Sequence, residues 1–170
     1  MHESILAGRL LTIMAGRTTE SLTTFSSWLI GSFAAILGLL LSKIDTVTTL
    51  LPAACIGLSI KIFLIAVSLH VLQRYLGAIV SGSEAASKEA ESAAPAGVTL
   101  DFSRVVNEIE RSIFWPARIF LRWTNKKILA GDFAAPGRLV VKLTQAQAFL
   151  VLGQMGFVGW AAYSLANGLV

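Results

Sequence analysis

A single lysine, Lys61, interrupts a long apolar stretch of this sequence. If that stretch crosses a membrane, the lysine places a positive charge in hydrocarbon. Between Thr46 and Gln73, Lys61 is the only residue of the Asp, Glu, Lys and Arg types. As a helix, a stretch of this length crosses about 30 Å of hydrocarbon, so Lys61 lies near the middle. A charge there costs at least about 2.5–3.5 kcal/mol on insertion scales. Such a residue indicates a functional site, for example a polar pathway.

Several environments are open for the Lys61 amine. It could point into a wet cavity or pore, or carbonyls and amides such as that of Gln154 could hold it, from this subunit or a neighbouring one. It could also be uncharged, or it could reach an interface by snorkelling or by helix tilt. Because Ala53 and Gly57 share a helical face with Lys61, the pattern favours a polar interior with Lys61 and Gln154 as candidate pathway residues.

A second group combines basic and aromatic residues. Arg118, Arg122 and Lys126 recur every fourth residue, and Trp115 and Trp123 accompany them. This pattern is typical of a helix that lies in the plane of an anionic membrane surface. We expect these five residues to bind lipid headgroups, since the aromatic neighbours suit phospholipid better than nucleic acid.

Enzyme motifs are missing from the sequence. It contains no glycine-rich phosphate loop, no G-x-S-x-G, no H-E-x-x-H and no paired carboxylates within an apolar stretch. Cys55 and the two distant histidines, His2 and His70, lack the spacing of a metal site. We therefore expect no catalysis, metal or cofactor, and we interpret His70 with Arg74 as an interfacial anchor.

The elements that position these residues follow from the apolar stretches. Of the 170 residues, 55% are hydrophobic and only 14% are charged. The pattern predicts an all-α integral membrane protein with three transmembrane helices, at about 21–42, 47–75 and 143–170, plus short amphipathic interfacial helices. The first two spans form a tight hairpin within residues 21–80. No room remains for a second folded domain of ordinary size.

Three further segments lie outside the spans. Residues 1–17 are predicted to form an amphipathic helix that ends at Gly16. Residues 81–98 are either a linker or a helical extension of the second span. Residues 99–142 are predicted to be a cytoplasmic, interfacial amphipathic region, with turns at Gly131-Asp132 and Pro136-Gly137.

Small residues recur at helical spacing along the spans. In the first span they form a face opposite bulky residues, and in lipid such faces let helix backbones approach closely. The candidate helix-packing positions are Ser27, Gly31, Ala35, Gly38, Ala53, Gly57, Gly153 and Gly156.

The distribution of charge predicts the orientation. The net charge is +4, and ten of the fourteen Lys and Arg residues lie between Arg74 and Lys142. Basic residues near span ends stay in the cytoplasm. We therefore expect a plasma or inner membrane protein with a cytoplasmic amino terminus and an external carboxyl terminus.

Two functions are compatible with these observations. The first is a small, non-enzymatic, oligomeric membrane protein that forms or gates a polar pathway, as pore-forming or membrane-permeabilising effectors do. The alternative is an accessory or anchoring subunit of a larger membrane complex, which docks a cytoplasmic partner through residues 99–130. The expected partners are the bilayer, anionic headgroups, and further copies or another membrane subunit, but no nucleic acid.

Overall fold

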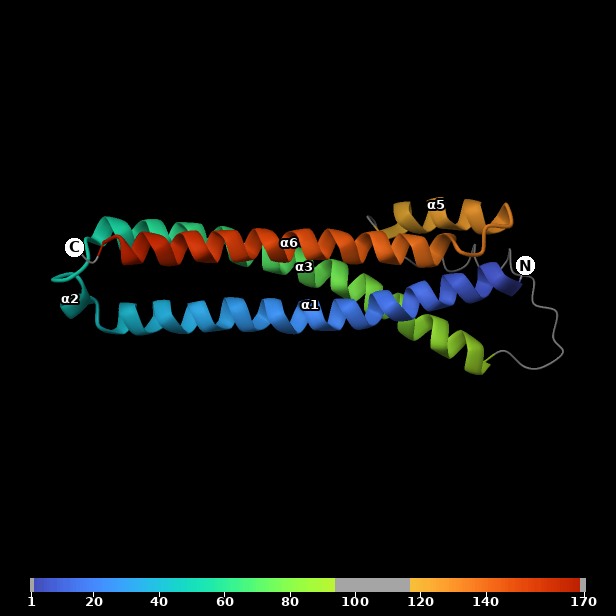
Figure 1. The fold of residues 1–170 in the computed structure, drawn as a ribbon, viewed down its shortest axis with the longest axis horizontal. Helices are drawn as coiled ribbons and strands as arrows, with labels where there is room; N and C mark the ends of the chain where they lie inside the picture. Colours follow the sequence, from blue (N-terminus) through green and yellow to red (C-terminus); the bar gives the residue numbers. More distant parts are fainter. Residues whose placement is uncertain (1, 94–116, 169–170) are drawn as a thin grey trace. The chain divides into compact units, whose positions relative to one another are not determined.

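The computed structural model describes residues 2–93 and 117–168, which are almost entirely helical and contain no β-strand. In chain order the helices are α1 (His2–Ser42), α2 (Ile44–Val47), α3 (Ala53–Ala93), α5 (Ala117–Leu129) and α6 (Ala135–Ala166) (Figure 1). In these residues, three helices are long and apolar enough to cross a membrane, namely α1, α3 and α6. The predicted all-α class and the three helices of membrane-spanning length are confirmed.

Large apolar side chains cover much of the outer surface of these helices. Trp28 and Leu39 on α1 are 73% and 71% exposed, and Phe149 on α6 is 75% exposed. A soluble protein rarely exposes such contiguous apolar surface, whereas hydrocarbon solvates it well. The distribution of side chains therefore suits a lipid environment.

α1 is one continuous helix where the sequence predicted two. The prediction that Gly16 ends a separate amino-terminal helix was wrong, because α1 runs through this residue. A Cβ atom at Gly16 would clash with the carboxylate of Glu84 on α3. The glycine therefore makes room for the Glu84 side chain rather than ending a helix.

α3 begins later and ends later than the predicted second span. It starts at Ala53, directly after Pro52, and not near residue 47. Proline suits the start of a helix because the first N–H groups have no partner within the helix. The short α2 and a series of turns occupy the connection from α1. Of the segment 81–98, the described part belongs to α3, which continues to Ala93.

α6 begins two turns before the predicted third span. Gly131, with φ of +89°, makes the turn after α5. The predicted turn at Pro136 and Gly137 is wrong, since both residues lie in the first turn of α6, where proline is tolerated. Gly137 packs directly against the backbone of Gly8 in α1, so a side chain at this position would collide with α1.

The chain divides into two compact units. The first comprises Met1–Arg17 and Ile79–Leu143, and the second comprises Thr18–Ala78 and Thr144–Val170. In the first unit, the Gly8–Gly137 and Gly16–Glu84 contacts join α1 to α6 and to α3. Ion pairs on its surface join Glu84 to Lys88, at 2.7 Å, and Asp132 to Arg138.

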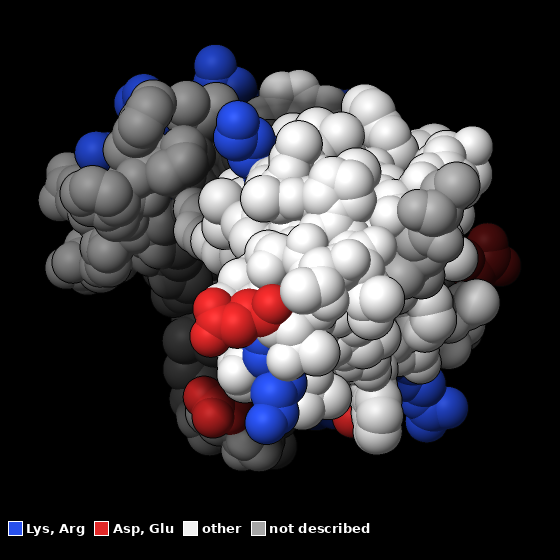
Figure 2. Space-filling model, turned by 90° about the vertical axis from the view of Figure 1, so that its left-hand side faces the viewer, with Lys and Arg blue, Asp and Glu red and all other residues white. Residues whose placement is uncertain are grey.

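The second unit is a bundle in which α1 and α6 run parallel and α3 runs antiparallel to both (Figure 1). At the end near α2, Gly168 packs against Leu51 and Cys55. Figure 2 views this end and shows that uncharged side chains make up most of the surface.

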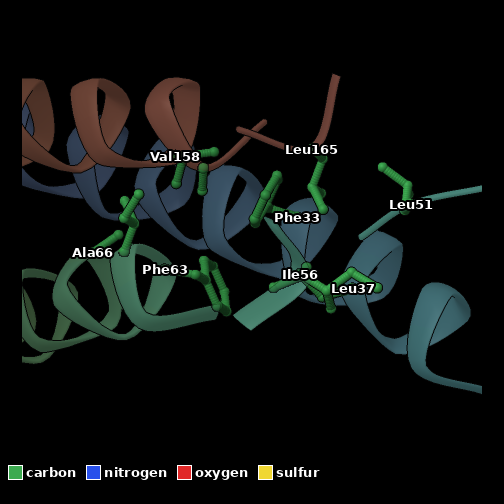
Figure 3. Close-up of a cluster of buried hydrophobic side chains, with 10 residues drawn as sticks. Phe33, Leu37, Leu51, Ile56, Phe63, Ala66, Val158 and Leu165 are labelled. Atoms are coloured by element: carbon green, nitrogen blue, oxygen red, sulfur yellow. The ribbon is translucent and has the colours of Figure 1, made fainter. Parts of the chain in front are cut away.

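Buried hydrophobic residues fill the bundle near this end; they come from α1, α3 and α6, except Leu51, which lies in the connection before α3 (Figure 3). The rings of Phe33 and Phe63 lie 5.2 Å apart, tilted by 48°. We call this group the apolar cluster, and its members are Phe33, Leu37, Leu51, Ile56, Ile62, Phe63, Ala66, Val158, Ala161 and Leu165.

Candidate functional site

Polar side chains line the other half of the interior of this bundle. They come from α1, α3 and α6 and recur at intervals of three, four or seven residues, which places those of each helix on one face. We call this group the polar layer, and its members are Thr19, Thr23, Ser26, His70, Gln73, Thr144, Gln147 and Gln154. Thr23 and His70 are half-buried and the other six are buried.

Three members of the polar layer form a hydrogen-bonded chain across the three helices. The Nδ1 atom of His70 lies 2.6 Å from Ser26 Oγ, and Ser26 Oγ donates to Gln154 Oε1. A carbonyl oxygen can only accept, so the single hydroxyl hydrogen of Ser26 is directed to Gln154. His70 Nδ1 then donates to Ser26 Oγ.

A second set of hydrogen bonds lies further from the apolar cluster, beyond His70 in the direction of Ala78 on α3. The hydroxyl groups of Thr19 and Thr144 are 3.2 Å apart, and Gln147 Nε2 donates to Thr19 Oγ1 at 3.3 Å. Gln73 Nε2 donates to Thr23 Oγ1, also at 3.3 Å. α1 is therefore bonded to both other helices, and such interhelical bonds contribute on average about 0.6 kcal/mol each within a membrane.

The interior changes character beyond Ser26 and His70. Phe33 follows Ser26 by seven residues on α1, and Phe63 precedes His70 by seven residues on α3, so the apolar cluster continues the same helix faces. One polar contact occurs within it, where Ser59 Oγ donates to the carbonyl oxygen of Ala161 at 2.7 Å. The polar layer is thus closed at one end by packed hydrophobic side chains.

The two candidate pathway residues occupy different environments. Gln154 is fully buried in the polar layer, whereas Lys61 is exposed on the outer surface of α3. Lys61 and His70 are nine residues apart, about two and a half helical turns, which puts them on opposite faces of α3. Within one copy of the chain, the amide of Gln154 does not hold the Lys61 amine.

The sequence interpretation missed most of the polar layer. His70, expected to be an interfacial anchor, instead bonds to Ser26, and Gln73 and Gln147 are fully buried. A signal was present, because Thr19, Thr23 and Ser26 share one helical face of α1. Hydroxyl residues are common in membrane helices whatever they face, so this signal alone does not separate buried from exposed positions.

The small residues predicted to pack helices have mixed roles. Ser27, Gly31, Ala35 and Gly38 are all exposed, and a Cβ atom at Gly31 or Gly38 would meet nothing within 4 Å. Ser27 and Gly31 also line a shallow open groove with Trp28 and Ser32. Within residues 2–93 and 117–168, the small-residue face of α1 therefore packs against no other helix.

Of the other predicted packing positions, one lies at a contact between described helices and three do not. A Cβ atom at Gly153 would lie 3.2 Å from Leu69 Cδ1, so this glycine does bring α6 close to α3. Ala53 is exposed, and Cβ atoms at Gly57 and Gly156 would lie in open space.

The candidate headgroup-binding residues belong to the first unit. Arg118, Arg122 and Lys126 are exposed on α5. Trp123 is 47% exposed, and the Nζ atom of Lys127 lies 4.0 Å from the centre of its ring. Trp115 lies outside the residues that the structure describes. α5 thus presents basic groups and an aromatic ring to its surroundings.

Within residues 2–93 and 117–168, His, Cys, Asp and Glu side chains form no group of three that could hold a metal ion. Comparisons with protein-family models, with curated proteins and with solved structures found no match.

Proposed function

We propose that this chain is a non-enzymatic membrane protein that assembles into oligomers and forms or gates a polar pathway. The observation that carries the proposal is the exposure of Lys61 among apolar side chains. Leu58 and Leu64, on the same side of α3, are 48% and 57% exposed. In hydrocarbon, a lone ammonium on this surface would cost at least about 2.5–3.5 kcal/mol. A water-filled pathway between subunits would remove that cost.

The small-residue face of α1 supplies a seam for such an assembly. Cβ atoms placed on its two glycines, Gly31 and Gly38, would meet nothing within 4 Å. In lipid, helices associate largely through close approach of their backbones at such small residues. A second copy of the chain has the same apolar, small-residue surface and could pack against it.

The experiment is ion flux from liposomes that contain equal amounts of wild-type protein and of a Lys61→Leu variant. We expect the variant to change the flux while the amount inserted is unchanged or larger, because leucine inserts more easily than lysine. A Leu64→Ile variant alters an exposed apolar neighbour and should leave the flux unchanged. Wild-type protein that conducts no ions under any condition would contradict the proposal.

The seam has its own test. Gly31→Leu should shift the protein to a smaller species on a sizing column in mild detergent, because leucine separates the helix backbones. The fold of each subunit should persist, since nothing lies within 4 Å of a Cβ atom at this position. Ile36→Leu, on an exposed part of the same helix, is the control and should run at the native size. A native-size Gly31→Leu variant would mean that the seam lies elsewhere.

We further propose that the amino terminus is cytoplasmic and the carboxyl terminus external, as the distribution of Lys and Arg favours. In a cysteine-free background, Asn167→Cys should react with an impermeant reagent added outside intact cells, and Ala86→Cys should not. The reverse pattern of labelling would overturn the orientation.

The exposed basic residues of α5 fit an anionic leaflet, where each Lys or Arg contributes about 1 kcal/mol. Added anionic lipid should therefore raise the Tm of the detergent-solubilised protein. The shift should be smaller for a variant with glutamine at Arg118, Arg122 and Lys126. Equal shifts for both proteins would refute lipid binding by these side chains.

A second function, that of an accessory or anchoring subunit, is favoured by the same two exposed surfaces. Another membrane subunit could fill the small-residue face of α1, and a cytoplasmic partner could bind the basic face of α5. Purification in mild detergent separates the two functions. A symmetric homo-oligomer supports the pathway, whereas a protein that is stable only with another polypeptide supports the accessory subunit.

A further inference from the structure

Three fully buried glutamines of the polar layer each use only one end of the side-chain amide. Gln73 and Gln147 donate from Nε2 and leave Oε1 without a partner, and Gln154 accepts at Oε1 and leaves Nε2 without one. All three residues are 0% exposed. In the part of the chain that the structure describes, four buried side-chain atoms lack a hydrogen bond, and these are three of them.

Such atoms are costly inside a membrane bundle. Each buried polar group left without a hydrogen bond costs about 1–3 kcal/mol, and hydrocarbon offers no partner in its place. Rotating an amide by 180° does not help. If Gln154 presented its nitrogen to Ser26, its oxygen would be left unpaired instead.

The three unpaired atoms lie along one short part of the interior. On α1 the polar layer runs from Thr19 to Ser26, which corresponds to about 10 Å of helix. On α3, Gly77 contributes no side chain there, and Gln147 Oε1 and Thr23 Oγ1 each lie 3.5 Å from the position that its Cβ would take. The backbone of α3 thus faces polar atoms of both other helices at this point.

We propose that the polar layer binds internal water molecules at the unused amide ends of Gln73, Gln147 and Gln154. Water both donates and accepts, so it matches two unpaired oxygens and one unpaired N–H group, and buried waters typically make about three hydrogen bonds. No member of the layer carries a carboxylate, ammonium or guanidinium group, so an ionic ligand finds no counter-charge in it.

The apolar cluster limits how far this water extends. Phe33 and Phe63, with rings 5.2 Å apart, close the interior beyond Ser26 and His70. The water therefore reaches the polar layer but does not cross the bundle. This inference is independent of the proposed pathway, which lies between subunits and not within one.

The test uses the full chain in lipid bilayers, labelled with 15N in the glutamine side chains. The sequence has four glutamines, and Gln145 is the only exposed one. Solid-state NMR measures how fast magnetisation passes from water to each side-chain amide. We expect all four signals to receive it at short mixing times, with the three buried amides within about a factor of two of Gln145.

A Gln145→Leu variant identifies the reference signal and, because this residue is exposed, should leave the fold unchanged. If only Gln145 receives magnetisation and the three buried amides lag several-fold behind it, the polar layer is dry and the inference is overturned. Ion flux plays no part in this measurement, so its failure would leave the proposed pathway untouched.

Discussion

The two halves of the second unit show two ways in which the same three helices hold together. In the polar layer, α1 is joined to α3 and α6 by directed hydrogen bonds, and the His70–Ser26–Gln154 chain links all three helices. In the apolar cluster the contacts are those of packed side chains such as Phe33 and Phe63. Lipid tails are as apolar as leucine, so moving these side chains from lipid into the bundle gives little hydrophobic free energy. The stability of the cluster therefore depends on close van der Waals packing.

The two halves therefore contribute differently to the packing of the helices. Hydrogen bonds need particular atoms at particular positions, so the polar layer can fix which turn of α1 faces which turn of α6. Dispersion contacts are undirected, so the apolar cluster adds attraction without selecting one register so strictly. Substitutions in the two halves should therefore differ in size and in their sensitivity to position.

The largest effect is expected in the apolar cluster. Phe63→Ala removes a buried ring that contacts Phe33 and should lower the free energy of unfolding by about 3 kcal/mol. Unfolding by SDS in mixed micelles measures this change. The control is Leu64→Ala at the next position, where the side chain is 57% exposed and the loss should be small. Equal losses for both variants would show that the cluster is not closely packed.

A smaller effect is expected in the polar layer. Ser26→Ala removes the hydroxyl that both His70 Nδ1 and Gln154 Oε1 contact and should cost about 1–2 kcal/mol in the same unfolding assay. Ser27→Ala is a matched control, because Ser27 is exposed and its hydroxyl donates to the carbonyl oxygen of Thr23 in its own helix, at 2.9 Å. That variant should stay within about 0.5 kcal/mol of wild type. A comparable loss at Ser27 would argue against the polar layer as a stabilising feature.

The smallest effect is expected at the boundary between the halves, where Gly153 packs on Leu69. Alanine favours a helix over glycine by up to about 1 kcal/mol, but a Cβ atom here would lie 3.2 Å from a Leu69 methyl group, which must shift slightly. Gly153→Ala should therefore change stability by less than about 1 kcal/mol. Gly159→Ala, where a Cβ meets nothing within 4 Å, should gain more. A larger gain at Gly153 would mean that this contact is loose.

The sequence by itself determined the class of the fold and the three long apolar helices, because hydropathy and helix period are local properties of the chain. It could not determine the roles of particular glycines. A glycine that ends a helix and one that admits a neighbouring side chain look alike in sequence, which is why Gly16 was misread and why α1 runs on past it.

Only the tertiary structure decided which polar residues face inward. Ser26 is buried and Ser27, one position later, is exposed, although both lie in the same apolar stretch. The partners of Ser26 are 44 and 128 residues away, so no local pattern reveals them. Likewise, sequence placed Lys61 in mid-span, but the packing of α1 and α6 on the opposite face of α3 is what directs it outward. A helix turns by about 100° per residue, so the side on which its neighbours pack determines whether a polar residue is buried or exposed.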